Sequence, residues 1–389
     1  MALFWLMVVA LLVVAAQAIL FGKRSLGKLF YTRRLSASQC HVGEPLEMIE
    51  ELENRSSLPL PWLRLEAMLP VAFQFAGSAD LVISEGTVYQ NHQSLFSLGR
   101  RVRIVRRHPL LARQRGMYRL DSVSMGVGDL FGLVRVNRPM PLQLDVTIYP
   151  PYLPSHHMPD AYSSWQGEME MRRWINEDPF LITGVREYRS GDPMNQVHWA
   201  ATARTGELQV YQHGYSADPE LLVVLNIELN EQMWSTVTEP AAAEYAISCT
   251  ATIVDDLLGR GMKAGFAHNA IIPYEDEERA YIAPGYGIEQ LYLILQMMAE
   301  LQLKIRRPFS QLIKGLIPED EQRMPTDILL VTPYVSEAIE ASIEELRNEG
   351  MRVEVLLLPS VEQMKQNYSM LMEQFRLKGA RPSSIGKSS

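Results

Sequence analysis

The side chains best suited to chemistry or to specific contacts gather between residues 186 and 204. An arginine there can form two parallel hydrogen bonds with a carboxylate such as that of Asp192. A tryptophan supplies a large apolar surface and one hydrogen-bond donor. These properties leave three interpretations open: a structural clasp that locks two domains, a docking surface for a partner, or a catalytic site around Asp192 and His198. The charged and aromatic members are Arg186, Glu187, Tyr188, Arg189, Asp192, His198, Trp199 and Arg204.

A catalytic site would require a nucleophile or a metal ion beside His198, and the neighbouring sequence offers no evident nucleophile. No histidine pair has the H-E-x-x-H spacing of a zinc hydrolase. The two cysteines, Cys40 and Cys249, are too widely separated in sequence to suggest a disulfide framework or a cysteine-rich zinc site. We therefore expect that the protein is not an enzyme and that it uses no cofactor.

The segment resembles the signature of the bacterial family called "domain of unknown function 58". That pattern is roughly R-x-Y-x-x-G-D-x-x-x-x-I-x-W-x-x-[ST]-A-R. It is matched here by Arg186, Tyr188, Gly191, Asp192, Trp199, Thr202, Ala203 and Arg204. Val197 replaces the isoleucine, and Asn195 stands where many members carry arginine. Residues 42–44 with Asn54 and residues 59–62 resemble an upstream landmark of the family, as do residues 115–118 followed by residues 128–133.

The resemblance implies an N-terminal membrane anchor, a β-region and a C-terminal von Willebrand factor A-like domain. Family members are usually encoded beside a MoxR-type AAA+ ATPase, often with transglutaminase-like membrane proteins, and are thought to act as adaptors or assembly factors. We therefore expect a membrane-anchored, non-enzymatic adaptor that works with a MoxR-type AAA+ ATPase on the cytoplasmic face. A transglutaminase-like membrane protein is a second candidate partner. The alternative is a cell-envelope hydrolase or scaffold with a site around Asp192 and His198.

A von Willebrand factor A-type domain often binds a divalent cation through a D-x-S-x-S motif after its first strand. The corresponding residues are Asn226, Glu228 and Asn230, which keep oxygen atoms suited to a hard cation but lack the leading aspartate and both hydroxyls. A later Asp-Gly that contributes to such sites is also missing, because Val331 is followed by Thr332-Pro333-Tyr334. We expect a degenerate site that holds no metal.

Residues 1–22 predict a transmembrane anchor. Residues 1–21 are apolar apart from Gln17, and some 20 apolar residues in a helix are long enough to span a bilayer. A cleaved signal peptide is the competing interpretation, because Ala16-Gln17-Ala18 resembles a cleavage site, but no basic residue precedes the apolar run. The basic flank follows the run, which predicts a single pass through the cytoplasmic membrane with the globular part in the cytoplasm. The flanking residues are Lys23, Arg24, Lys28, Arg33 and Arg34.

Hydrophobic periodicity predicts an α+β protein with two domains after the anchor. Alternation of apolar and polar residues indicates a β-sandwich-like domain over residues 37–150. Prolines then introduce residues 151–217, which we interpret as a linker together with the signature segment. Apolar strands alternate with amphipathic helices over residues 218–377, which is typical of a doubly wound α/β domain. Residues 378–389 are predicted to be a disordered tail.

Charge argues against nucleic acid as a partner, because the 389-residue chain has a formal net charge of −8. The most basic stretch lies between Arg100 and Arg115 and contains five further arginines between them. We interpret it as the solvated face of strands, with a surface for anionic lipid as the first alternative and nucleic acid as the second.

Overall fold

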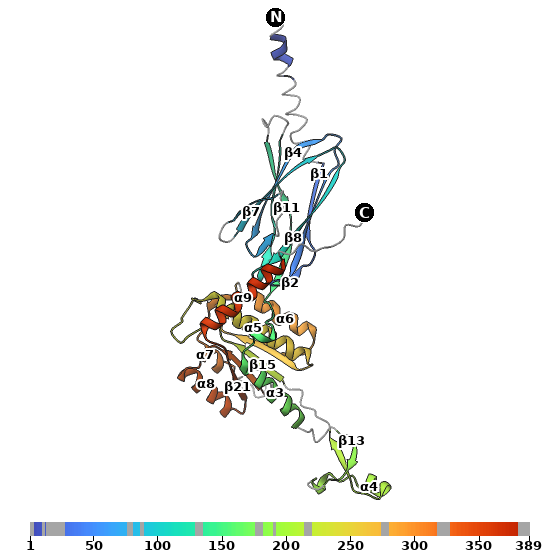
Figure 1. Cartoon of the computed structure of the whole chain (residues 1–389), viewed down its shortest axis with the longest axis vertical. Helices are drawn as coiled ribbons and strands as arrows, with labels where there is room; N and C mark the ends of the chain where they lie inside the picture. The colour runs from blue at the N-terminus through green and yellow to red at the C-terminus, as the bar shows by residue number, and fades with distance from the viewer. Residues whose placement is uncertain are drawn as a thin grey trace. The chain divides into compact units, whose positions relative to one another are not determined.

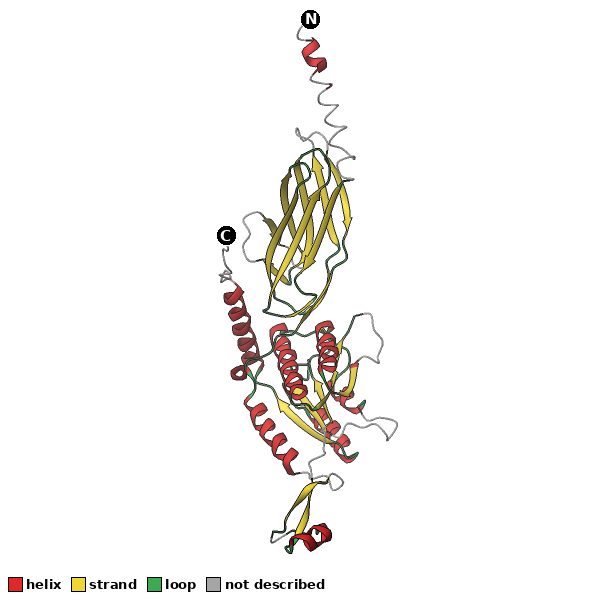
Figure 2. Ribbon diagram, turned by 90° about the vertical axis from the view of Figure 1, so that its right-hand side faces the viewer, coloured by secondary structure: helices red, strands yellow, loops and turns green. Residues whose placement is uncertain are grey.

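A computed structural model describes residues 4–9, 12, 28–75, 81–85, 89–128, 135–175, 182–189, 192–213, 220–273, 280–316 and 327–379. The chain divides into two compact units. The first consists of residues 1–151, 295–301 and 369–389, and the second of residues 152–294 and 302–368. Antiparallel strands dominate the first unit and a mainly parallel sheet with helices forms the second (Figures 1 and 2). The predicted mixed α+β fold is confirmed at this level.

Two larger antiparallel sheets and a small three-stranded sheet form the first unit. The orders are β1-β3-β8-β5, β11-β10-β4-β7-β6 and β2-β12-β9, and only the β2–β12 pair among them is parallel. The strands are β1 (Leu29–Leu35), β2 (Gln39–His41), β3 (Pro45–Asn54), β4 (Leu60–Pro70), β5 (Phe73–Phe75), β6 (Leu81–Glu85), β7 (Tyr89–Leu98), β8 (Arg103–Ala112), β9 (Gly116–Arg119), β10 (Ser122–Gly128), β11 (Arg135–Pro141) and β12 (Asp145–Tyr149). This β-sandwich-like arrangement was predicted, although its first strand begins before residue 37.

The core of the first unit contains two apolar clusters, and polar side chains lie buried between them. Along β3, Met48 belongs to one cluster and Leu52 to the other. Glu50 lies between these two residues on the same face of the strand and is also buried. A carboxylate in this position must be hydrogen-bonded, because an isolated buried charge is strongly destabilising.

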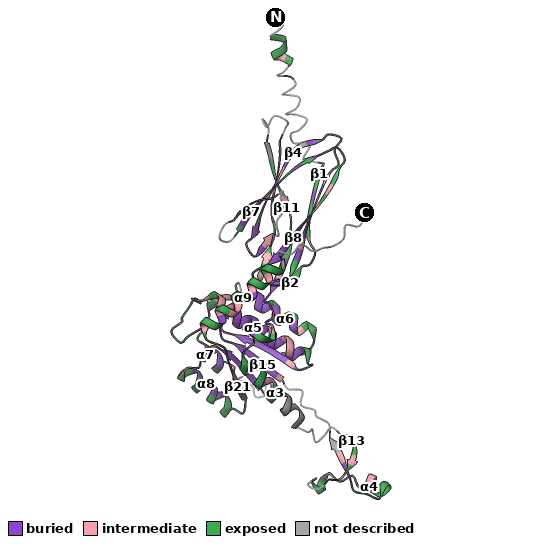
Figure 3. Ribbon diagram, in the orientation of Figure 1, coloured by how far each residue is buried: buried purple, intermediate pink, exposed green. Residues whose placement is uncertain are grey.

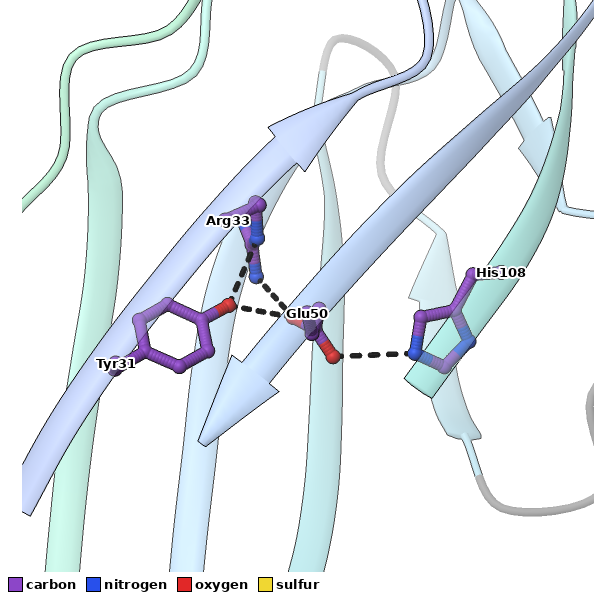
Figure 4. A network of polar contacts seen from close by, with 4 residues as sticks. All are labelled: Tyr31, Arg33, Glu50 and His108. Carbon is purple, nitrogen blue, oxygen red and sulfur yellow. Dashed lines mark hydrogen bonds and ion pairs between the residues drawn. The ribbon is translucent and has the colours of Figure 1, made fainter. Parts of the chain in front are cut away.

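Glu50 accepts hydrogen bonds from three buried side chains on neighbouring strands (Figure 4). Its Oε1 accepts from the Tyr31 hydroxyl at 2.6 Å and from Nη2 of Arg33 at 2.8 Å. Its Oε2 lies 3.1 Å from Nε2 of His108. Burial opposes ionisation of Glu50, but the hydrogen bonds and the Arg33 charge outweigh it and lower the pKa of Glu50 to about 2. Arg33 is therefore a core residue. The prediction from sequence that it belongs to the exposed basic flank was wrong.

The basic strand β8, which lies within the stretch from Arg100 to Arg115, pairs with the acidic strand β3. Arg103 forms an ion pair with Glu51 at 2.6 Å, and Arg107 forms one with Glu47 at 3.2 Å. Two arginines of this stretch therefore pair with glutamates of the neighbouring strand, and both stay more than half exposed.

Two of the segments that carry the family resemblance, residues 42–44 and 115–118, make specific contacts inside the first unit. Nη1 of Arg115 donates to the carbonyls of Met298 at 2.8 Å and Leu301 at 2.7 Å, at the end of a helix where carbonyls have no helical partner. Gly43 has φ +89°, and a Cβ atom at this position would overlap the ring of Phe375. Both landmarks thus position segments that are distant in sequence.

A five-stranded sheet of order β18-β16-β15-β20-β21 is the centre of the second unit. Its strands are parallel except β18, which is antiparallel at one edge. The central strands are buried (purple in Figure 3), as expected for apolar strands covered on both faces. Its elements are β15 (Glu220–Leu225), α5 (Pro240–Gly259), β16 (Lys263–His268), β17 (Ala270–Ile271), β18 (Tyr281–Gly285), α6 (Ile288–Glu300), β19 (Gln302–Ile305), α7 (Phe309–Lys314), β20 (Asp327–Thr332), α8 (Glu337–Asn348), β21 (Arg352–Leu357) and α9 (Val361–Gly379), the last turns of α6 and α9 belonging to the first unit.

The elements before β15 are η1 (Ser155–His157), α3 (Asp160–Ile175), β13 (Ile182–Glu187), η2 (Met194–Gln196), α4 (Trp199–Thr205) and β14 (Gln209–His213). Most of the predicted anchor lies outside the described residues. The part of it that the structure describes, residues 4–9 and 12, is helical. Within the described part of the chain, the structure contains no helix of sufficient length and apolarity to cross a membrane. The predicted tail also lies outside this part, except Lys378 and Gly379, which end α9.

We predict that His92 on β7 makes the first unit sensitive to acid. Its side chain is buried, its ring centroid lies 3.9 Å from that of Phe75, and burial together with the Arg33 charge lowers its pKa to about 4. The unfolded chain binds a proton near pH 6.5, so this contribution to stability is complete above pH 6.5 and is lost as the pH falls towards 4. We expect the free energy of unfolding to decrease by roughly 2 to 3 kcal/mol across this range because of His92 alone.

Urea titrations of the full chain at pH 7 and pH 4.5, read by pulsed hydrogen exchange of β3 and β7 peptides, would measure this effect. In a His92→Leu variant the decrease should be smaller by the stated amount, because leucine cannot titrate. An unchanged pH dependence in that variant would contradict the assignment.

Candidate functional site

The signature segment forms a small hairpin, and we use "signature hairpin" for its described residues 182–189 and 192–213. Strands β13 and β14 pair antiparallel, with Arg186 opposite Val210 and Glu187 opposite Gln209. The short helix α4 lies in the connection between these strands (Figure 1). Val197 forms an isolated bridge with Val210, and both side chains are buried. The segment therefore has a small apolar centre of its own.

A paired ion bridge joins Arg186 on β13 to Asp192, which lies before η2. Nη1 of Arg186 donates to Oδ2 of Asp192 at 2.7 Å, and Nη2 donates to Oδ1 at 2.8 Å. The backbone amide of Arg189 donates to the same carboxylate at 2.8 Å. The hydrogen bonds from Arg186 and then from the Arg189 amide lower the pKa of Asp192 to about 2. We call the Arg186–Asp192 pair the clasp; it lies within the signature hairpin, and the role expected from the sequence, that of locking two domains, stays a prediction.

His198 is the N-cap residue of helix α4. Its Nδ1 accepts a hydrogen bond from the Ala201 amide at 3.1 Å, as an N-cap residue does. The Thr202 hydroxyl donates to the His198 carbonyl at 3.1 Å and accepts from the Gln209 amide at 3.0 Å. These contacts connect α4 to β14 and engage the hydroxyl that lies near His198 within the described hairpin.

Several large side chains of the hairpin remain exposed. Trp199 is 66% exposed and Met194 is 58% exposed. Arg189 and Arg204 are also exposed, whereas Tyr188 is half-buried. The structure thus brings Arg186 and Asp192 together, places His198 at a helix cap, and leaves Trp199 and Arg204 at the surface. Gly191 lies outside the described residues.

The second candidate site lies at the carboxyl end of the parallel sheet in the second unit. Asn226 follows β15, Asn269 follows β16 and Thr332 ends β20. Oδ1 of Asn226 accepts from Nδ2 of Asn269 at 2.9 Å, and Nδ2 of Asn226 donates to the Thr332 hydroxyl at 3.0 Å. All three residues are fully buried. Adjacent parallel strands therefore end in one connected polar cluster.

Glu228 extends this cluster to a third loop. Its Oε1 accepts from the Phe309 amide at 2.9 Å and from Nδ2 of Asn269 at 3.1 Å. Its Oε2 accepts from the Tyr334 hydroxyl at 2.7 Å. Burial raises the pKa of Glu228, and the hydrogen bonds oppose this increase only in part. Every one of these donors is a neutral group.

The expected degenerate metal positions are not all brought together. Asn226 and Glu228 share the cluster, whereas Asn230 is exposed and accepts a hydrogen bond from the Gln232 amide at 3.0 Å. The sequence prediction missed Asn269, which the buried strand before it could have indicated, because a polar residue directly after such a strand lies at the same sheet edge. The described part of the chain contains no group of three or more His, Cys, Asp or Glu residues arranged for a metal ion.

The fold and the hairpin define a mixed α+β protein in which an antiparallel unit precedes a unit with a parallel sheet. Residues 184–366 match the family model described as "Protein of unknown function DUF58". Comparison with curated proteins found no match.

Solved structures similar to the chain cover about a third of it. The CARDB domain of the PF1109 protein from Pyrococcus furiosus is 20% identical, with 31% of this chain and 93% of that chain covered and a TM-score of 0.20. A non-cellulosomal cohesin from Archaeoglobus fulgidus is 11% identical, with 30% and 90% covered and a TM-score of 0.22. A type I cohesin in complex from Clostridium thermocellum is 10% identical, with 30% and 98% covered and a TM-score of 0.21.

We predict that Asp192→Asn loosens the signature hairpin. Asparagine is uncharged and has a single acceptor oxygen, so it cannot accept both hydrogen bonds that Arg186 donates to Asp192. Hydrogen exchange should become faster at the Arg189 amide and in α4, as measured by mass spectrometry on the full chain. The control is Glu187→Gln, which removes a charge from an exposed neighbouring carboxylate outside the clasp.

The pH dependence of the clasp follows from the pKa of Asp192. A carboxylate whose pKa is lowered to about 2 contributes stability above its ordinary value of 3.8, and this contribution is lost as the pH falls through 2. Protection of the Arg189 amide should therefore persist at pH 4. Loss of protection at that pH would show that the paired bridge does not form.

Proposed function

We propose that the protein is a membrane-anchored, non-enzymatic adaptor that works with a MoxR-type AAA+ ATPase on the cytoplasmic face of the inner membrane. In this proposal residues 1–22 are the anchor and the second unit is a doubly wound, von Willebrand factor A-like domain. The signature hairpin is the docking surface for the ATPase. A transglutaminase-like membrane protein is a further candidate partner.

The observation that supports the proposal most directly is that the signature hairpin is held by its own side-chain hydrogen bonds while several of its large side chains are exposed. The clasp and the Thr202 hydroxyl hold the connection in place through side-chain hydrogen bonds. Trp199 and Met194 are more than half exposed on this framework, and Arg189 and Arg204 of the same hairpin are also exposed. Tryptophan and arginine are the residues that most often dominate the binding energy of protein interfaces.

The geometry gives little support to catalysis at Asp192 and His198. A carboxylate held by Arg186 with a pKa of about 2 is a weak general base at neutral pH. Nδ1 of His198 is already engaged with the Ala201 amide. A non-enzymatic role is therefore favoured over the cell-envelope hydrolase.

The membrane part of the proposal rests on sequence. The apolar run of residues 1–21 is long enough to span a bilayer, and Lys23, Arg24 and Lys28 follow it. Arg34 is exposed on β1 and adds to this flank. Excess basic residues mark the cytoplasmic side, whereas the net charge of −8 offers no support for nucleic acid as a partner.

The A-like assignment of the second unit is supported by the sheet end. Strands β16, β15 and β20 are parallel neighbours, and their carboxyl ends carry the cluster of Asn226, Asn269 and Thr332. Polar groups at the carboxyl ends of parallel strands are the usual location of binding sites in open α/β sheets.

We predict that Trp199→Ala weakens binding of the ATPase by about 30-fold or more, because an aromatic residue at the centre of an interface is often worth about 2 kcal/mol or more. Arg204→Ala should act in the same direction. Dissociation constants would be measured by biolayer interferometry with full-length protein in detergent and the MoxR-type ATPase of the same genome, with ATP, with ADP and without nucleotide.

The matched control is Tyr286→Ala, which removes an aromatic side chain that is 73% exposed and lies outside the hairpin. Binding should be unchanged in this variant. Failure of the wild-type protein to bind the ATPase in every nucleotide state would refute the adaptor role, and equal effects of both variants would refute the hairpin as its surface.

The scaffold alternative differs in topology and is tested separately. If the proposal is correct, a reporter that is active only in the cytoplasm should be active when it is fused after Ser389. Activity on the outer side of the membrane would favour the cell-envelope scaffold.

A further inference from the structure

The oxygen atoms at the carboxyl end of the sheet in the second unit are already used by hydrogen bonds within the protein. Oδ1 of Asn226 accepts two N–H groups, from Nδ2 of Asn269 and from the Glu228 amide at 2.9 Å. A carbonyl oxygen has two lone pairs, so neither is left to coordinate a cation. Oε1 of Glu228 likewise accepts two N–H groups, from Asn269 and Phe309.

The hydroxyl groups at this sheet end are also engaged. The Thr332 hydroxyl donates to the Tyr334 carbonyl at 2.7 Å and accepts from Nδ2 of Asn226 at 3.0 Å. The Tyr334 hydroxyl donates to Oε2 of Glu228 at 2.7 Å. A divalent cation requires several free oxygen ligands, whereas these oxygens face N–H and O–H protons that carry partial positive charge.

We propose that this cluster is a cation-independent lock, in which the Tyr334 hydroxyl, the Phe309 amide and Nδ2 of Asn269 together do what a bound divalent cation would do for Glu228. The proposal concerns the residues around Glu228 alone and does not depend on the adaptor role. It explains how the chain tolerates a buried carboxylate whose described partners are all neutral.

The lock connects four segments of the second unit through a single side chain. Glu228 lies in the loop after β15, and its partners lie after β16, at the start of α7 and after β20. The loop after β15 is further held by the Val237 amide, which donates to the Leu303 carbonyl at 3.1 Å. Trp234 lies in this loop and is 88% exposed. These hydrogen bonds attach the loop to its neighbouring segments, and Trp234 lies at its surface.

Divalent cations provide the first test. Thermal unfolding of the full-length protein would be compared after treatment with EDTA and in millimolar Mg²⁺ or Mn²⁺, and the melting temperature should not change. Isothermal titration with MnCl₂ should show no saturable binding. A saturable increase in melting temperature that Glu228→Gln abolishes would overturn the proposal.

Removal of the phenolic hydroxyl provides the second test. Tyr334→Phe keeps the ring but deletes a donor to the buried carboxylate, so the melting temperature should fall by about 3 °C or more. Hydrogen exchange in residues 226–239 should become faster, and EDTA should not reproduce this change. The control is Tyr286→Phe, which removes a hydroxyl from an exposed tyrosine.

Equal behaviour of the two tyrosine variants would overturn the lock. If Tyr334→Phe does not fold, the titration of the wild-type protein with Mn²⁺ still decides whether the sheet end binds a cation.

Discussion

Each unit of the protein contains a buried carboxylate whose oxygens must be hydrogen-bonded, and the surrounding strands and loops are arranged to supply the donors. Glu50 connects β1, β3 and β8 in the first unit. Glu228 connects the ends of β15, β16 and β20 with the start of α7 in the second. An ionised carboxylate without such partners would cost several kcal/mol in the interior. The position of each glutamate therefore restricts which strands can be neighbours and in which register.

The two carboxylates are satisfied in chemically different ways, and their pKa values change in opposite directions. Arg33 brings a cation to Glu50, so burial is outweighed and the pKa of Glu50 falls. Glu228 receives only neutral donors within the described cluster, so burial dominates and its pKa rises. The first arrangement resembles a buried ion pair, which is strongly destabilised when one partner is removed. The second depends on several weaker hydrogen bonds that fix loops.

The sequence predicted the overall fold because the periodicity of apolar residues is local. Alternating strands and the βα pattern were both visible, and the mixed α+β architecture is confirmed. The role of Arg33 was not predictable, because its partner Glu50 is brought close only by the register of β1 with β3. Arg33 also follows an apolar segment, where basic residues normally indicate membrane topology. Asn269 was missed for the same reason, since its partners Asn226 and Glu228 come from another strand end.

The pairing of Arg186 with Asp192 was easier to infer, because the two residues are close in sequence. The exposure of Trp199 could not be inferred, because the sequence around a tryptophan does not show which residues cover it in the fold. This contrast bears on which surface is better suited to bind a partner. At the sheet end the oxygens of Asn226 and Glu228 already accept hydrogen bonds from the protein. The signature hairpin instead holds its own polar contacts internally and leaves Trp199 and Arg204 exposed, which favours it as the place where a partner would bind.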